Sequence, residues 1–156
     1  MRSILVLAPP WLPARALGVF ARRLARHGAL VDVVRVPFRS RPAVLARVAA
    51  RAERIGRTVG KGASLVFFDR AGQLSKGLAD TLAPHGGDSI FLGPRDLTAT
   101  DVPVGSTIVH AAEDAWTVPI HPGIQNSMIM LDGLGHLSLL MAPHVADVVT
   151  DALANP

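Results

Sequence analysis

The 156-residue sequence contains no cysteine and no tyrosine, and aromatic residues make up only 4% of it. Without cysteine the chain forms no disulfide, which is compatible with a reducing compartment, and a domain of this size needs none. Without tyrosine, the chain lacks the tyrosine side chains on which nucleic-acid bases often stack. Low-complexity runs are also absent, and a composition that is 49% hydrophobic and 18% charged excludes a disordered chain. We therefore predict a single globular domain spanning residues 1–156.

Long hydrophobic runs are absent too. The apolar run Ile4–Leu7 is followed closely by Pro9, so it is too short for a signal peptide or a membrane span. The spacing of His110, His121 and His144 does not suit a metal site. The sequence thus predicts a cytoplasmic protein with no membrane span, no metal and no cofactor. It carries no signal for a particular oligomeric state.

Positive charge is concentrated near the N-terminus. The net charge is +4, and 12 of the 14 arginines lie within residues 2–57. Six of them recur at helical spacing opposite leucine, valine and phenylalanine, as on the solvated faces of two amphipathic helices. These six are Arg22, Arg23, Arg26, Arg47, Arg51 and Arg54. No nucleic-acid-binding motif accompanies them, so we expect no nucleic-acid partner.

Short apolar runs alternate with helical patterns along the chain. The runs of strand length are residues 4–7, 30–36, 64–68, 89–92, 107–111 and 127–131. The helical patterns are residues 14–27, 42–55, 71–82 and 143–153. Because the strands are apolar throughout, the pattern predicts an α/β fold, with a mostly parallel sheet of about six strands between two layers of helices. Gly28, Gly56 and Gly86–Gly87 follow three of the helical patterns, as C-terminal caps do.

Ionisable residues follow three of the expected strands, at the sheet edge where such folds bind ligands. Asp69 lies between the run 65–68 and a helix start, which is the setting of the nucleophile elbow G-x-S-x-G, here Phe-Phe-Asp-Arg-Ala. Asp114 follows the run 107–111, and His136 lies in a loop rich in glycine after the run 127–131. The order nucleophile, acid, histidine is the order found in α/β-hydrolases.

The sequence resembles the minimal, lidless bacterial lipases of the α/β-hydrolase superfamily. Residues 133–140 look like the catalytic-histidine loop of that family, and Glu113–Asp114 looks like its acid turn. The resemblance extends more weakly over nearly the whole chain. It implies a minimal three-layer α/β-hydrolase domain without cap or lid, with Asp69 in the nucleophile position and with Asp114 and His136 completing the triad.

An aspartate at the elbow also resembles the haloalkane and haloacetate dehalogenases and the epoxide hydrolases. In those enzymes the carboxylate attacks carbon, and a histidine then activates water against the resulting ester. They carry a helical cap for which this chain has no room, and the epoxide hydrolases use cap tyrosines that it lacks. A second register would place Arg70 at the elbow. We prefer Asp69 because that choice preserves the length of the strand.

The loop after the first strand lacks a feature that acyl transfer requires. In the family this loop donates a backbone N–H to the developing oxyanion, a contribution of about 2.7–4 kcal/mol. Here it contains Pro9 and Pro10, and proline has no N–H. Together with the missing serine, this argues against an ordinary serine lipase.

The proposed triad residues have simpler interpretations as well. Asp69 is suited to capping the following helix through its side chain. Glu113 competes with Asp114 as the partner of the histidine, and either is also suited to a solvated turn. His136 is alternatively a structural loop histidine, although its glycine-bracketed position after a strand favours a functional role.

Trp11, Arg70 and Trp116 are the candidate substrate-binding residues. The tryptophans either line the mouth of a pocket or pack against the protein, and Arg70 either binds an anionic substrate or is solvated.

Two hypotheses for function follow. In the first, an Asp69–His136–Asp114 relay acts on a small, largely apolar substrate, either through an aspartyl nucleophile or by acid/base catalysis. In the second, a catalytically silent member of the fold binds a ligand or a protein.

Overall fold

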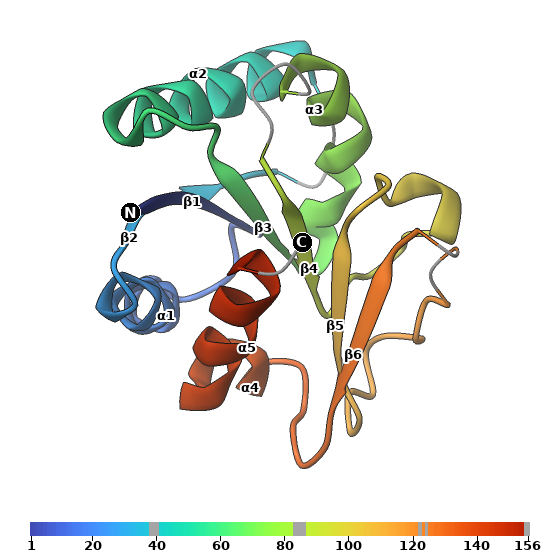
Figure 1. The fold of residues 1–156 in the computed structure, drawn as a ribbon. Coiled ribbons are helices and arrows are strands. Elements are labelled where there is room, and N and C mark those ends of the chain that lie inside the picture. The colour runs from blue at the N-terminus through green and yellow to red at the C-terminus, as the bar shows by residue number, and fades with distance from the viewer. Residues whose placement is uncertain (38–40, 83–86, 122, 124, 155–156) are drawn as a thin grey trace.

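A parallel sheet forms the centre of the protein (Figure 1). The computed structural model describes residues 1–37, 41–82, 87–121, 123 and 125–154. Within them, six strands pair in the order β2-β1-β3-β4-β5-β6, all parallel. They are β1 (Arg2–Ala8), β2 (Ala29–Arg35), β3 (Ser64–Phe68), β4 (Ser89–Leu92), β5 (Thr107–Ala111) and β6 (Ser127–Leu131). The prediction of an α/β fold with about six parallel strands is confirmed.

Helices cover both faces of this sheet (Figure 1). The α-helices are α1 (Ala14–Arg26), α2 (Pro42–Val59), α3 (Ser75–Leu82), α4 (Ser138–Met141) and α5 (Pro143–Ala154). In the described part of the chain, two short 3-10 helices, η1 (Asp69–Leu74) and η3 (Ala99–Asp101), follow β3 and β4. One face carries α1, α4 and α5, and the other carries α2 and α3. No described helix is long and apolar enough to cross a lipid bilayer.

The sequence pattern explains these layers. Side chains alternate across β1, so that Ile4 and Val6 pack in the core under α1 while Leu5 and Leu7 pack in the core under α2. Both sets are apolar because both faces of the strand are buried, as in parallel sheets generally. Helix α1 buries its own apolar stripe, which includes Phe20, against the first of these cores.

One predicted helix boundary is wrong. Helix α2 runs on to Val59, and Gly60, with φ of +73°, follows it as the left-handed C-terminal residue. Gly56 therefore lies inside the helix and is not its cap. A Cβ on Gly56 would lie 2.7 Å from the backbone oxygen of Lys61, so glycine is required there for close packing against the returning chain.

The other two predicted caps differ from each other. Gly28, with φ of +80°, follows α1 as predicted. At Gly87, a Cβ would overlap the backbone oxygen of Ala63, so glycine is required there for close packing against that segment of the chain. Gly86 lies outside the described residues. The predicted helix 71–82 begins earlier, as η1 at Asp69, and continues as α3.

Candidate active site

Asp69 occupies a sharp turn between β3 and η1. Its φ is +55°, a left-handed conformation that is unfavourable for a residue with a Cβ, and its side chain is fully buried. The interpretation of Asp69 as a side-chain helix cap is wrong, because Phe68 holds the N-cap position and Asp69 is already the first residue of η1. The strained turn instead directs the Asp69 carboxylate toward the loops that follow β4 and β6.

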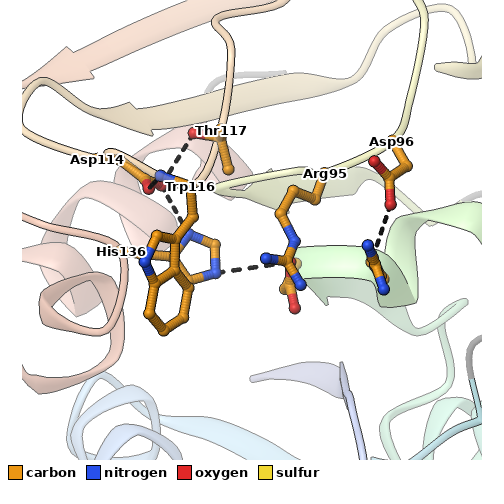
Figure 2. Close-up of polar contacts among 8 residues, drawn as sticks. Arg95, Asp96, Asp114, Trp116, Thr117 and His136 are labelled. Carbon is orange, nitrogen blue, oxygen red and sulfur yellow. Dashed lines mark hydrogen bonds and ion pairs between the residues drawn. The ribbon is translucent and has the colours of Figure 1, made fainter.

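His136 contacts both aspartates of the predicted triad. Its Nδ1 lies 2.6 Å from Oδ2 of Asp114 (Figure 2). Its Nε2 lies 3.6 Å from Oδ1 of Asp69. The imidazole is buried between the rings of Phe68 and Trp116, whose centroids lie 4.9 and 5.1 Å from its own. The structure thus brings the three predicted residues together at the carboxyl edge of the sheet.

Three donors hold the Asp114 carboxylate. Besides the histidine, the backbone N–H of Trp116 donates to it over 2.8 Å and the hydroxyl of Thr117 over 2.9 Å (Figure 2). Burial acts to raise the pKa of Asp114, but the hydrogen bonds from His136, Trp116 and Thr117 outweigh it and lower that pKa below its ordinary value. An ionised Asp114 accepts a hydrogen bond from the N–H of Nδ1, which leaves the lone pair of Nε2 directed toward Asp69.

The competing acid, Glu113, has a different partner. Its Oε1 accepts a hydrogen bond from the backbone N–H of Gly133 over 3.0 Å. This contact ties the loop after β5 to the loop after β6, which carries His136. Of the two adjacent acids, the structure therefore pairs Asp114, and not Glu113, with the histidine.

The site contains a further charged residue, Arg95, which was not among the candidates predicted from the sequence. Its Nε lies 2.8 Å from Oδ1 of Asp69 and forms an ion pair with it. The signal in the sequence was its position, because Arg95 follows the strand 89–92 at the same sheet edge as the triad. Among the described residues, both Asp69 oxygens, Nε of Arg95 and Nε2 of His136 have no partner with hydrogen-bond geometry. These buried polar atoms face one another at the centre of the site.

Gly93 gives the histidine its space. A Cβ at this position would lie 3.0 Å from Cε1 and Nδ1 of His136 and 2.9 Å from Leu139. Gly93 also has φ of +51°, which turns the chain sharply after β4. A glycine is therefore needed here for two separate reasons, and the turn it forms leads directly to Arg95.

The two predicted tryptophans lie beside the triad. Trp11 and Trp116 meet edge to face with centroids 6.2 Å apart, and with Arg95 they line a cavity of about 350 Å³. The Arg95 guanidinium lies 5.8 Å from the centroid of Trp116. Arg70 pairs with Asp96 over 2.6 Å and does not line this cavity, so the structure favours Asp69 over Arg70 as the elbow residue facing His136.

A larger cavity, of about 840 Å³, lies at the opposite edge of the sheet. Its lining includes Gly56 and residues at the amino ends of β3, β4 and β5. None of the triad residues lines it. In the described part of the chain, no group of three or more His, Asp or Glu side chains is placed to hold a metal ion.

Comparison with known proteins identifies the fold. No protein-family model and no curated protein matches the chain. Solved structures do match it over nearly its whole length. One of two metagenome-derived lipolytic enzymes, LipS and LipT, aligns with a TM-score of 0.72 and 11% identity, over 99% of this chain and 94% of that one.

Two further structures align similarly. An α/β hydrolase enzyme from the metagenome of lagoon sediments has a TM-score of 0.70 and 12% identity, covering 96% of this chain and 89% of its own. The esterase domain of a Rhodothermus marinus protein has a TM-score of 0.66 and 14% identity, covering 97% and 84%. The chain therefore has the α/β-hydrolase fold, as the sequence resemblance implied.

Proposed function

We propose that this α/β-hydrolase-fold protein is a hydrolase in which Asp69 is the nucleophile, His136 the base and Asp114 the residue that orients the histidine. One observation carries the proposal. The buried Asp69 carboxylate lies at a strained elbow with Nε2 of His136 at 3.6 Å, and Nδ1 of the same ring is held at 2.6 Å by Asp114. Nucleophile, base and orienting acid are the three roles that such a relay requires.

The proposed reaction has two steps. First, an Asp69 oxygen attacks a carbon that bears a leaving group, so that a C–O bond forms and the leaving group departs with its electron pair. Second, His136 takes a proton from water, whose oxygen attacks Cγ of the aspartyl ester. The tetrahedral intermediate then expels the alcohol oxygen, which receives the proton back from His136. Asp69 is left as a carboxylic acid that carries the second proton of the water, and release of this proton to solvent balances the leaving group of the first step and regenerates the carboxylate.

The surroundings of the relay favour a small, largely apolar substrate. The indole rings of Trp11 and Trp116 line the adjacent cavity of about 350 Å³, and Phe68 packs against the catalytic ring. Aromatic walls bind apolar groups well, and a hollow of this size suits a small molecule. A second form of this proposal is acid/base catalysis by Asp69 and His136 without a covalent intermediate. The experiment below distinguishes it from the covalent route.

The test is to trap the ester. The His136→Gln variant is incubated with 1-bromobutane, bromoacetate or 1,2-epoxybutane and analysed by intact-protein mass spectrometry. We expect a mass increase that peptide digestion maps to Asp69, because the ester forms and the base that hydrolyses it is missing. The chain has no cysteine, so the commonest site of adventitious alkylation is absent.

The matched control is the double variant Asp69→Asn/His136→Gln, which should gain no mass. Labelling mapped to another residue would refute Asp69 as the nucleophile. If no probe labels the single variant while both single substitutions still abolish activity, acid/base catalysis replaces the covalent route.

A catalytically silent binding protein is the second candidate, and two observations favour it. The Asp69 side chain is 0% exposed and already paired with Arg95, so a substrate reaches it only if Arg95 or a neighbouring ring moves. Pro9 and Pro10 also remove two backbone donors. In that case Asp69→Asn and His136→Gln should leave ligand affinity nearly unchanged and neither variant should gain mass.

A further inference from the structure

The second step of the proposed reaction places a negative charge where the protein has lost its usual donor. Water attack on the ester turns the remaining carboxyl oxygen of Asp69 into an oxyanion. In this fold two backbone N–H groups usually stabilise an oxyanion, one from the residue after the nucleophile and one from a loop after an earlier strand. The second donor cannot come from Pro9 or Pro10, because neither residue has an N–H.

Arg95 supplies a donor at this position from a different loop. Its Nε lies 2.8 Å from Oδ1 of Asp69, within the range of 2.7–3.1 Å expected for an oxyanion donor. Neither atom has a partner with hydrogen-bond geometry among the described residues, so in the resting protein the contact is an ion pair in which the N–H does not point at Oδ1. A small turn of the guanidinium would align this N–H with the oxyanion. The guanidinium is also steadied by its position over Trp116, 5.8 Å from the ring centroid.

We infer that Arg95 is a further catalytic residue, which stabilises the oxyanion on Oδ1 of Asp69 during hydrolysis of the aspartyl ester in place of the missing backbone donor. This inference rests on the proposed function. The alkyl group occupies Oδ2 in the ester, and Oδ1 is the carbonyl oxygen that gains the charge. The proton taken from water stays on His136 and leaves with the alcohol, so Arg95 keeps its own protons throughout.

The charge on Arg95 has opposite consequences for the two steps. In the resting protein Asp69 is ionised against Arg95, and attack on carbon removes that negative charge, so the ion pair holds the nucleophile back. In the ester the carboxyl group is neutral, and water attack restores a full negative charge beside the guanidinium. Only the second step therefore gains an interaction that is stronger in the transition state than in the state before it.

A merely structural ion pair would not separate the steps in this way. Loss of a structural partner would perturb the position of Asp69 and slow both steps together. If Arg95 instead bound an anionic substrate, its loss would weaken binding of bromoacetate and leave 1-bromobutane unaffected. The signature of the inferred role is an ester that forms at least as fast and then persists.

The experiment measures the two steps separately. A probe that labels Asp69 in His136→Gln is mixed in single turnover with the parent protein and with Arg95→Gln, both with His136 intact, and the mass of the protein is followed in time. In Arg95→Gln we expect the ester to form at the parent rate or faster and to decay about 100- to 1,000-fold more slowly. The ester should therefore accumulate in the variant and not in the parent.

Three further variants guard against misinterpretation. Arg95→Lys keeps a positive charge beside Asp69, so it serves as the test protein if Arg95→Gln folds poorly. In Arg95→Lys the ester on Asp69 should decay at a rate between those of the parent and of Arg95→Gln. Arg26→Gln makes the same chemical change at an exposed arginine of α1 and should match the parent. Added ethylguanidinium should speed ester decay in an Arg95→Ala variant and leave the parent unchanged.

Each outcome separates the inference from the proposal on which it rests. No labelling of His136→Gln by any probe would refute the covalent function itself. Labelling of His136→Gln together with parent-like ester decay in both Arg95 variants would overturn the role of Arg95 and leave the function standing. Loss of labelling in Arg95→Gln and Arg95→Lys would assign Arg95 to substrate binding or positioning instead.

Discussion

Asp69 combines two unfavourable properties, a left-handed backbone and a buried negative charge. A positive φ in a residue with a Cβ is destabilising by roughly 1–2 kcal/mol, and a buried carboxylate requires a partner. Arg95 supplies that partner, and the flanking strand and 3-10 helix hold the turn. Strain of this kind persists where the surroundings enforce it, most often at functional sites.

Ordinary ester hydrolysis tests the residue-level argument about oxyanion donors. We expect the natural protein to hydrolyse p-nitrophenyl acetate at a rate within about tenfold of the Asp69→Asn variant. The oxyanion would form on the substrate carbonyl, where Pro9 and Pro10 offer no N–H, and one missing donor lowers kcat by about 100- to 1,000-fold. The measurement is release of nitrophenolate against a buffer blank. Rapid turnover that Asp69→Asn abolishes would contradict this reasoning.

The placement of the three predicted residues at one sheet edge could be anticipated from the sequence because the chain order carries that information; their catalytic roles stay a prediction. Asp69, Asp114 and His136 each follow an apolar strand, so parallel strands bring them to one edge whatever the details of packing. The contact between Arg95 and Asp69 depends instead on how the turn at Gly93 packs beneath His136. No local pattern encodes that packing.

At the level of elements, apolar runs located the strands well because both faces of the sheet are buried along β1, β3, β4 and β5. Strand β6 is also an apolar run, although it is largely exposed. The end of α2 was misjudged for a related reason. Gly56 resembles a helix stop when only its neighbours in sequence are considered, whereas its role comes from the backbone at Lys61, which passes 2.7 Å from where its Cβ would be. The short helix α4 was not predicted, since four residues carry too little periodicity to be recognised.

Two helical glycines should respond oppositely to the same substitution. Gly56→Ala should lower the free energy of unfolding by about 1–3 kcal/mol, because the added methyl meets rigid backbone. Gly18→Ala in α1 should raise it by about 0.5–1 kcal/mol, because the nearest atom, on Arg22, is 3.6 Å away and alanine favours the helix. Urea unfolding of both variants measures the difference. Stabilisation by Gly56→Ala would show that α2 adjusts without strain.

Over the whole molecule, stability should depend on pH through two buried groups. Burial lowers the pKa of His110 below its ordinary value of 6.5; the charge of Asp114 opposes this and His121 adds to it. Because the unfolded chain then binds a proton more readily than the folded one, the free energy of unfolding decreases as pH falls below about 6.5. Asp114, with its lowered pKa, adds a second decrease below its ordinary 3.8, and both contributions are fully present at neutral pH.

Urea unfolding between pH 8 and pH 3 tests this dependence. The curve should be flat near neutral pH and should decline in two stages, with a slope of at most about 1.4 kcal/mol per pH unit for each group. His110→Gln should flatten the first stage because it removes the group that titrates there. Glutamine retains an acceptor for the N–H of Ile120, which lies 3.1 Å from Nε2 of His110, so the fold should be preserved. An unchanged first stage in this variant would assign the decline to other histidines.

The strand order also determines when the residues of the proposed relay can meet during synthesis. Strands β1 to β5 can pair as they leave the ribosome, but His136 follows β6, the last strand and the edge of the sheet. At ordinary translation speeds His136 emerges roughly 3–13 s after Asp69. Because the turn at Gly93 that leads to Arg95 packs beneath His136, we expect the pairing of Arg95 with Asp69 to wait for this last segment as well. If Asp69 is the nucleophile that we propose, a chain truncated before β6 carries it without its base, and an ester formed on it would persist.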